Sequence, residues 1–271
     1  MKVLFCDIDG TLAGRNFIIP QKHIKALEML KKSGWYLVAA TGRNPFSIEK
    51  VLTDETPFDE VMFTTGVGVM QWPSREIIYS LTLEDRVIKK AISLFDNLGF
   101  DVMVQQPHPE NHHFFYLQKE QMGDDTQRRL DIYQNFAKPL DKEHLMHVSG
   151  ANVVAVGDES DTIWNQVVAH FPEAKVVRAT SPLDGKSMWI EIYPKGAGKA
   201  AAAQSIAERL NILPKDCVGI GNDYNDIELL DFCGEAYMVK TFDKIDEFPQ
   251  FTPIDTPEKE GFYTVVMEKL L

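Results

Sequence analysis

Residues 2–11, KVLFCDIDGT, carry the strongest structural signal of this chain. A short run of mostly apolar, β-favouring residues stops at an acidic turn that contains Asp7, Asp9 and Gly10. Such a run is typical of a strand that is buried on both faces, as in a parallel sheet. The stretch therefore predicts an internal strand with two carboxylates at its carboxyl end.

The chain that follows alternates between helical and strand patterns. A helical pattern starts at Pro20 and stops before Gly34, and residues 35–40 form a second apolar run. A further helical stretch passes through Ile48, and residues 60–65 give a third strand pattern. This order of strands and helices predicts an α/β protein with a doubly wound parallel sheet.

The ends of these strands carry the first candidate functional residues. Ligands of a doubly wound sheet bind at the carboxyl ends of its strands, where Asp7, Asp9 and Thr41 stand in this chain. Two carboxylates held together repel each other unless a cation or a shared proton relieves them, and a hard cation such as Mg²⁺ takes oxygen ligands. The bare Asp-x-Asp pattern also occurs in solvated turns, so both interpretations stay open at this point.

A second acidic turn follows another apolar run. Residues 217–221 (CVGIG) give a further strand pattern, and residues 221–226 (GNDYND) place four oxygen-bearing side chains directly after it. Two such turns at one edge of a sheet can converge on one metal ion. The alternative is an Asx-rich turn that caps a helix starting at Ile227. Capping and metal binding are compatible, so this alternative does not exclude a metal site.

The pattern changes between the two acidic turns. Two short strands around Pro73 suggest a hairpin. Residues 82–187 then show strand and helix patterns that are typical of a separate α/β unit. The first pattern returns at residues 189–193 and continues through an alanine-rich helix. Insertion of one domain into another is the most economical explanation of this return. The predicted boundaries are residues 1–81 and 188–271 for the core and residues 82–187 for an inserted α/β domain.

The composition limits the classes of function. Of the 271 residues, 28 are Lys or Arg and 40 are Asp or Glu, which gives a formal net charge of −12. This acidic balance disfavours nucleic acids and anionic membranes as partners. No run approaches the ~18 apolar residues of a membrane helix, and the N-terminus has no signal-peptide pattern. Cys6, Cys217 and Cys233 form no CxxC pair and are expected to be reduced thiols of a cytoplasmic protein.

Four motifs of this chain resemble those of the haloacid dehalogenase superfamily of phosphohydrolases, in its Cof-like branch. Residues 5–12 (FCDIDGTL) look like the first signature, and residues 40–43 (ATGR) resemble the second motif. Lys199 resembles the third motif, and residues 221–226 resemble the fourth. The resemblance implies a Rossmann-like core whose inserted α/β domain, between the second and third motifs, is a cap that selects the substrate.

The resemblance also implies roles for the motif residues. Asp7 would attack phosphorus and form an aspartyl-phosphate, and Asp9 would act as the general acid and then as the general base. Thr41, through its hydroxyl, and Lys199, through its charge, would hold the transferring phosphoryl group. Arg43 either reaches the substrate or pairs with an acidic neighbour. The residues expected to bind substrate are thus Thr41, Gly42, Arg43 and Lys199.

The Mg²⁺ ligands that the resemblance implies include one departure from the family pattern. The metal would be bound by the Asp7 side chain, by the main-chain carbonyl of Asp9 and by the loop of the fourth motif. That loop usually reads Gly-Asp-x-x-Asn-Asp, whereas this chain has Asn222 at the first acid and an additional Asp223. An amide oxygen is a neutral and weaker Mg²⁺ ligand. The register favours Asn222 and Asp226 as ligands, with Asp223 as the alternative.

Three histidines, His108, His112 and His113, lie in or beside a predicted loop at residues 106–112. A metal-binding role would require a carboxylate or a cysteine at ligand spacing. The sequence pattern lacks that spacing, so we expect this loop to be solvated.

Together, the motifs predict a Mg²⁺-dependent phosphatase that acts on a small phosphorylated metabolite, such as a phosphosugar, as a monomer or weak homo-oligomer. The first alternative is a phosphomutase or phosphotransferase of the same fold, which would need a basic pocket for a second substrate. The other is a non-catalytic protein that binds a phosphorylated ligand, and only Asn222 supports it.

Overall fold

Two compact units make up the chain. The first unit contains Met1–Arg43, Ser47–Ser80 and Gly198–Leu271, and the second contains Asn44–Phe46 and Leu81–Ala197. The structure is a computed structural model, and it describes residues 1–14, 16–141, 144–145, 149–157, 160–181, 183–184, 187–242 and 244–271. Among these residues, no helix is both long and apolar enough to cross a membrane.

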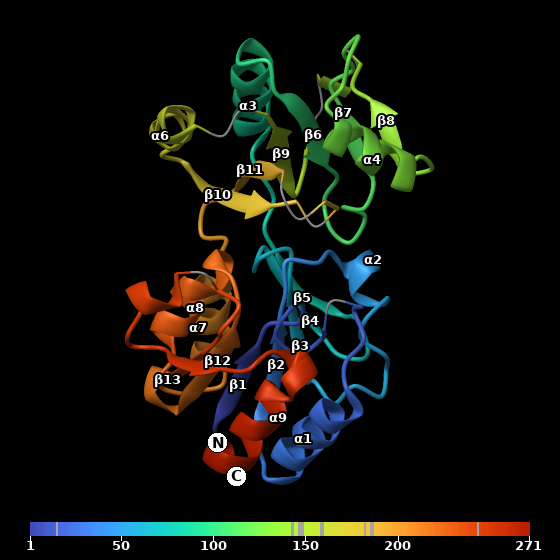
Figure 1. The fold of residues 1–271 in the computed structure, drawn as a ribbon. Helices are drawn as coiled ribbons and strands as arrows, with labels where there is room; N and C mark the ends of the chain where they lie inside the picture. The colour runs from blue at the N-terminus through green and yellow to red at the C-terminus, as the bar shows by residue number, and fades with distance from the viewer. Residues whose placement is uncertain are drawn as a thin grey trace. The chain divides into compact units, whose positions relative to one another are not determined.

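An eight-stranded sheet forms the centre of the first unit (Figure 1), with the strand order β14-β13-β12-β1-β2-β3-β4-β5. Neighbouring strands from β14 to β3 are parallel, and β4 and β5 are added in antiparallel fashion. The parallel part confirms the predicted doubly wound sheet. The strands are β1 (Val3–Cys6), β2 (Tyr36–Ala40), β3 (Glu60–Phe63), β4 (Gly68–Gln71), β5 (Ile77–Ser80), β12 (Cys217–Gly221), β13 (Glu235–Val239) and β14 (Thr252–Ile254).

Helices cover both faces of this sheet. Alternate residues of β1 point to opposite faces, so Leu4 packs in one apolar cluster with Leu27 and Phe262, whereas Phe5 packs with Ile206 in another. Because both faces are covered, the central strands are apolar throughout. The helices are α1 (Gln21–Lys32), α7 (Lys199–Arg209), α8 (Ile227–Phe232) and α9 (Gly261–Val265), with α2 (Pro45–Ile48) between the two units in sequence; short helical turns are η1 (Pro214–Asp216), η2 (Tyr224–Asp226), η3 (Ile245–Glu247), η4 (Pro257–Lys259) and η5 (Val266–Leu270).

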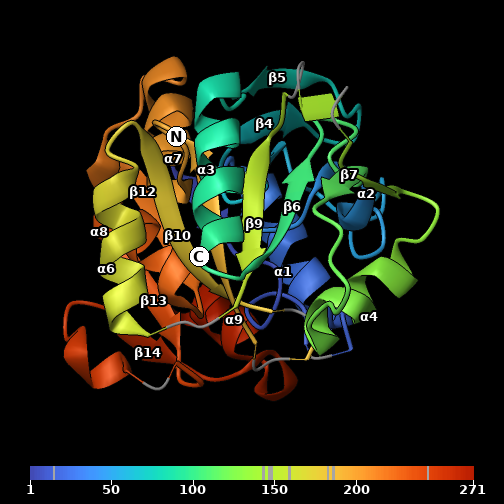
Figure 2. The same ribbon diagram turned by 90° about the horizontal axis from the view of Figure 1, so that it is seen from above.

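A six-stranded sheet in the order β10-β11-β9-β6-β7-β8 forms the second unit. Its neighbouring strands are antiparallel, except for the parallel pair of β7 and β8. Helices α3 and α6 cover one face (Figure 2), where Phe95 and Val167 join an apolar cluster with β6, β9 and β11. The elements are α3 (Asp85–Asn97), β6 (Asp101–Gln105), β7 (Phe114–Tyr116), α4 (Asp124–Ile132), β8 (Ala137–Pro139), β9 (Asn152–Val156), α6 (Asp161–His170), β10 (Ala174–Thr180) and β11 (Met188–Pro194).

The place of β11 differs from the prediction. The sequence pattern predicts that residues 189–193 resume the core, but β11 pairs with β9 and β10 in the second sheet. Ile190 and Ile192 belong to the apolar cluster with α3 and α6, while Trp189 belongs to another cluster. With apolar residues on both faces, this antiparallel strand has the composition of a buried parallel strand. The first unit resumes at Gly198, later than the predicted boundary at residue 188.

Candidate active site

Three neighbouring strands of the first unit end at the candidate site. β1 leads into Asp7 and Asp9, β2 leads into Thr41, and β12 leads into Asn222. The three strands are parallel neighbours, so residues far apart in the sequence meet at one edge of the sheet. Lys199, the first residue of α7, joins them from the start of that helix.

The ammonium group of Lys199 lies at the centre of this cluster, and its side chain is fully buried. Nζ donates to Asp7 Oδ1 at 2.8 Å, to Asp226 Oδ1 at 2.6 Å and to Asn225 Oδ1 at 3.3 Å. These three acceptors match the three donors of an ammonium group. The arrangement fixes the position of Lys199 and leaves the second oxygens of Asp7 and Asp226 for other partners.

Burial decides the charge balance of the cluster. It raises the pKa of Asp7 above the ordinary value; Lys199 opposes this shift, and Asp226 and Asp9 add to it. Burial alone would lower the pKa of Lys199, but the carboxylates of Asp226 and Asp7 outweigh it, and the pKa rises. Lys199 is therefore a cation that faces more carboxyl groups than it can neutralise. A second cation at this place would stabilise the ionised form of Asp7.

Arg43 binds the second carboxylate of the first motif. Its Nε and Nη2 atoms each donate to one carboxylate oxygen of Asp9 at 2.7 Å, which makes a bidentate ion pair. Nη1 donates to the Ser47 carbonyl oxygen at 3.2 Å, and the guanidinium group lies over the Phe17 ring. Of the two alternatives for Arg43, the structure therefore shows the acidic neighbour.

Thr41 follows β2 directly and is almost fully buried. Its Oγ1 accepts a hydrogen bond from the main-chain N–H of Arg43 at 3.0 Å, so the hydroxyl can still donate its own hydrogen to a ligand. Gly42 is exposed, and the Thr65 side chain lies beside it. The main chain at Gly42 is therefore open to the approach of a phosphate group.

The turn after β3 has an unusual backbone conformation. Thr64, Thr65 and Gly66 have φ values of 48°, 53° and 80°, and β-branched residues rarely occupy this left-handed region. A Cβ atom at Gly66 would overlap the main-chain carbonyl of Gly198. The turn thus packs against the residue before Lys199 and supports its position. By the resemblance to the Cof-like branch, Thr65 stands where an Asn that is often near the substrate is usual.

The Asn222 amide lies against three oxygen atoms of the first motif. One of its terminal atoms lies 3.0 Å from Asp7 Oδ2, 3.0 Å from the main-chain oxygen of Asp9 and 3.2 Å from Thr11 Oγ1. All three neighbours are oxygen atoms, so the amide nitrogen takes this position and donates to them. A half-turn of the amide places its oxygen there instead, 3.0–3.2 Å from these three oxygen atoms.

The spacing of these oxygen atoms fits Mg²⁺. In an octahedral site with bonds of about 2.1 Å, adjacent ligand oxygens lie ~3.0 Å apart, as the amide of Asn222 does from Asp7 and Asp9. Gly10 makes room for the amide: its φ is 81°, and a Cβ atom there would lie 2.6 Å from the other terminal atom of the Asn222 amide. The sequence motif contains Thr11 as well, but its contact with Asn222 is visible only in the structure.

The two acids of the fourth motif hold the loop. Asp226 is fully buried, and its Oδ2 accepts from the main-chain N–H groups of Asn222 at 2.9 Å and Asp223 at 3.2 Å. Asp223 accepts from the Tyr224 N–H at 2.7 Å and caps η2 in a reciprocal capping box with Asp226. Since Oδ1 of Asp226 binds Lys199, both oxygens of this carboxylate are engaged. These contacts position Asn222, rather than either acid, beside the first motif.

Replacing Asn222 tests this geometry. Asn222→Asp sets a carboxylate against two acceptor oxygens, so we expect a lower melting temperature in EDTA and a larger stabilisation by added Mg²⁺ than in the wild type. Melting curves with and without Mg²⁺ measure both effects. The control is Asp223→Ala, which loses an N-cap worth about 0.5–2 kcal/mol but keeps the wild-type response to Mg²⁺. If Asp223→Ala alone removes that response, Asp223 is the ligand instead.

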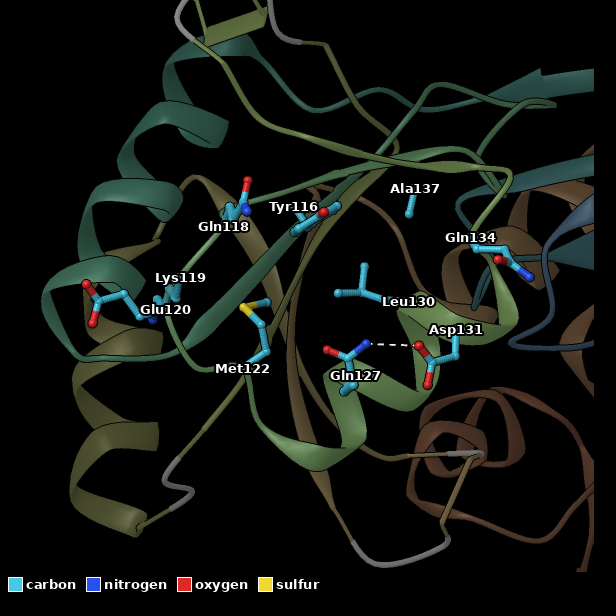
Figure 3. Close-up of a pocket in the computed structure, with 10 residues that line it drawn as sticks. All are labelled: Tyr116, Gln118, Lys119, Glu120, Met122, Gln127, Leu130, Asp131, Gln134 and Ala137. Atoms are coloured by element: carbon cyan, nitrogen blue, oxygen red, sulfur yellow. Dashed lines mark hydrogen bonds between the residues drawn. The ribbon is translucent and has the colours of Figure 1, made fainter.

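A separate hollow lies in the second unit beside β7 and α4 (Figure 3). Along α4, Gln127 Nε2 donates to Asp131 Oδ1 at 2.9 Å. The hollow contains none of the predicted site residues. It is lined by Tyr116, Gln118, Lys119, Glu120, Met122, Gln127, Leu130, Asp131, Gln134 and Ala137.

Known proteins share this sequence pattern and fold. The model of the haloacid dehalogenase-like hydrolases matches residues 4–245. The 5-amino-6-(5-phospho-D-ribitylamino)uracil phosphatase YwtE of Bacillus subtilis is 24% identical, over 98% of this chain and 97% of its own. A phosphatase of the haloalkanoate enzyme superfamily from Bacteroides thetaiotaomicron has a TM-score of 0.81 at 20% identity, over 98% of this chain and 94% of its own. A subclass IIB sugar phosphatase has a TM-score of 0.76 at 18% identity, over 98% of both chains. Because the family model spans all four motifs, this chain belongs to the haloacid dehalogenase-like hydrolases.

Proposed function

We propose that this protein is a Mg²⁺-dependent phosphatase that hydrolyses a small phosphate monoester through an aspartyl-phosphate on Asp7. The observation that carries the proposal is the buried contact between Asp7 and Lys199, beside the Asn222 amide. A nucleophile, a fixed cation and a set of oxygen ligands thus lie together at one edge of the sheet. Membership of a hydrolase family supports this chemistry.

In the first step, a carboxylate oxygen of Asp7 attacks phosphorus, and the bond between phosphorus and the ester oxygen breaks. Lys199 and the Thr41 hydroxyl hold the phosphoryl oxygens. The leaving oxygen takes a proton from Asp9. Both oxygens of Asp9 accept hydrogen bonds from Arg43 in the structure, so Asp9 leaves Arg43 before it donates a proton. In this scheme Arg43 positions Asp9.

In the second step, Asp9 removes a proton from water, and the water oxygen attacks phosphorus. The bond between phosphorus and Asp7 breaks, and phosphate leaves. Asp7 is restored as a carboxylate, and Asp9 regains the proton that it gave in the first step. The same two carboxyl groups therefore complete the cycle without net change.

Asp7, the main-chain carbonyl of Asp9 and Asn222 would hold the Mg²⁺ ion. When bound, the ion neutralises charge that develops on the phosphoryl oxygens. The environment of Asp7 makes this contribution important, because burial raises the pKa of its carboxyl group and only the ionised form is a nucleophile. In this scheme Asp223 and Asp226 hold the loop and do not bind the ion.

The substrate class that we favour is a small phosphorylated metabolite with a sugar-like group. Two similar proteins are named for such compounds, a phosphoribitylamino uracil and a sugar phosphate. The net charge of −12 disfavours a nucleic-acid substrate. The contact of Asp7 with Lys199 favours catalysis over the alternative of a non-catalytic binding protein.

Phosphate release from p-nitrophenyl phosphate and from a panel of sugar phosphates tests the proposal. We expect turnover with Mg²⁺, none with EDTA, and a higher kcat/KM for at least one sugar phosphate than for p-nitrophenyl phosphate. Folded protein that binds Mg²⁺ but releases no phosphate while it phosphorylates a second sugar would be a phosphotransferase. Protein that neither turns over any ester nor binds Mg²⁺ would contradict the proposal.

A further inference from the structure

The loop between β6 and β7 of the second unit brings three metal-ligating side chains together. Glu110, His112 and His113 each offer one ligand atom, and these atoms lie within 4.8 Å of one another. Oε2 of Glu110 is 3.6 Å from Nε2 of His112 and 3.6 Å from Nε2 of His113. The sequence pattern shows no carboxylate at ligand spacing from these histidines, whereas in the structure a turn carries the exposed Glu110 back to both rings.

The distances within this group do not fit hydrogen bonding. A charge-assisted N–H···O bond measures about 2.7–2.9 Å, so 3.6 Å between Glu110 and each ring is too long. A tetrahedral metal site with bonds of about 2.0–2.2 Å places its ligand atoms about 3.3–3.6 Å apart. The Glu110 carboxylate therefore lies at ligand separation from each imidazole. The three ligand atoms together lie within 4.8 Å of one another, so binding of one ion draws them slightly closer.

Aromatic contacts fix the two imidazoles in place. The His112 ring stacks on Phe46, with centroids 4.5 Å apart and planes 15° apart. Phe136 meets the His112 ring edge-on at 5.0 Å and the His113 ring edge-on at 4.9 Å. The His113 main-chain N–H donates to the Glu110 carbonyl at 2.9 Å, which closes the turn. Little freedom of the two rings therefore remains to be lost when a ligand binds, and such preorganisation favours binding.

A neutral imidazole keeps the lone pair that a metal ion needs. Imidazole nitrogens suit Zn²⁺ and related transition-metal ions, whereas Mg²⁺ is bound by oxygen ligands.

We propose that Glu110, His112 and His113 form a binding site for a transition-metal ion of the Zn²⁺ class, with water completing the coordination. These three residues belong to the second unit, whereas the residues of the candidate active site belong to the first. A filled site would fix the ring on which Phe46 stacks, and Phe46 follows Arg43 by three residues in the chain. Two chemically different metal sites would thus serve one chain.

Calorimetric titration of the full chain with Zn²⁺, in millimolar Mg²⁺, tests the proposal. We expect one equivalent to bind, also in Asp7→Asn, because the excess Mg²⁺ and this substitution remove competition from the active site. His112→Gln and His113→Gln should each weaken binding by about tenfold or more, and Glu110→Gln should weaken it too. The matched control is His170→Gln, an exposed histidine of α6 outside the group, which should bind as the wild type does. Co²⁺ in place of Zn²⁺ should give the visible absorption of a tetrahedral site in the wild type, in Asp7→Asn and in His170→Gln, but not in the double variant His112→Gln/His113→Gln.

Two results would overturn the proposal. One is the absence of Zn²⁺ binding to the wild type below about 100 μM. The other is unchanged affinity in the double variant His112→Gln/His113→Gln, which would place the bound ion elsewhere. Glu110 is exposed, so Glu110→Gln tests the site without risk to folding. Neither result depends on phosphate release, so the metal site and the proposed phosphatase activity are tested independently of each other.

Discussion

Asp7→Asn is expected to reduce phosphate release by about 10³-fold or more while the fold stays intact. The amide that replaces the carboxylate cannot form the aspartyl-phosphate, and loss of a covalent nucleophile removes most of the rate enhancement. The substitution keeps the size of the side chain and its capacity to accept from Lys199, which lies 2.8 Å away. Steady-state assays with Mg²⁺ measure the effect, and circular dichroism checks the fold. More than a few per cent of residual activity would remove Asp7 from the role of nucleophile.

The stability of this variant without metal gives an independent check. The pKa of Asp7 is raised in the folded protein, whereas an unfolded aspartate has a pKa of about 3.9. Between these two values the folded state holds a proton that the unfolded state has released, so stability falls as pH rises through this range. An asparagine at position 7 does not titrate, so the variant lacks this fall in stability with rising pH. In EDTA we expect Asp7→Asn to melt at or above the wild type at pH 8, with a smaller difference at pH 5; a variant much less stable at pH 8 would contradict the raised pKa.

The fold of the first unit is largely readable from the sequence, for a physical reason. Strands that are buried on both faces must be apolar along their length, and the polar residues that follow them mark where they end. Residues 2–6 and 217–221 show this pattern, and the structure has β1 and β12 at Val3–Cys6 and Cys217–Gly221. The pattern fails at residues 189–193, because an antiparallel strand with apolar neighbours on both faces has the same composition.

Contacts between side chains are harder to predict, since they depend on how turns bend. Asn222 and Asp223 are adjacent in the sequence, yet the capping box turns Asp223 to Tyr224 and leaves Asn222 beside Asp7. The ion pair of Arg43 with Asp9 joins residues that follow two different strands. The register of the fourth motif favours Asn222 over Asp223, but no periodicity or spacing predicts these side-chain contacts themselves.

Lys199→Ala is expected to lower both activity and stability by large amounts. The substitution leaves the buried carboxyl groups of Asp7 and Asp226 without their shared cation. Removing one partner of a buried ion pair typically costs about 3–5 kcal/mol, because the remaining charge is uncompensated. Phosphate release should fall as well, since no cation then holds the phosphoryl group. Lys195→Ala, at an exposed lysine four residues earlier, is the control and should resemble the wild type in urea unfolding and in turnover.

A second substitution separates the electrostatic effect from the loss of packing. If uncompensated charge causes the instability, the double variant Lys199→Ala/Asp226→Asn should recover part of the lost free energy of unfolding, because it removes one of the two carboxylates. It should not recover activity, because the cation stays absent. If the double variant is less stable than Lys199→Ala, then Asp226 matters chiefly through its hydrogen bonds to the main-chain N–H groups of Asn222 and Asp223. Recovery of stability without turnover would instead show that Lys199 stabilises the fold by neutralising the buried carboxylates of Asp7 and Asp226.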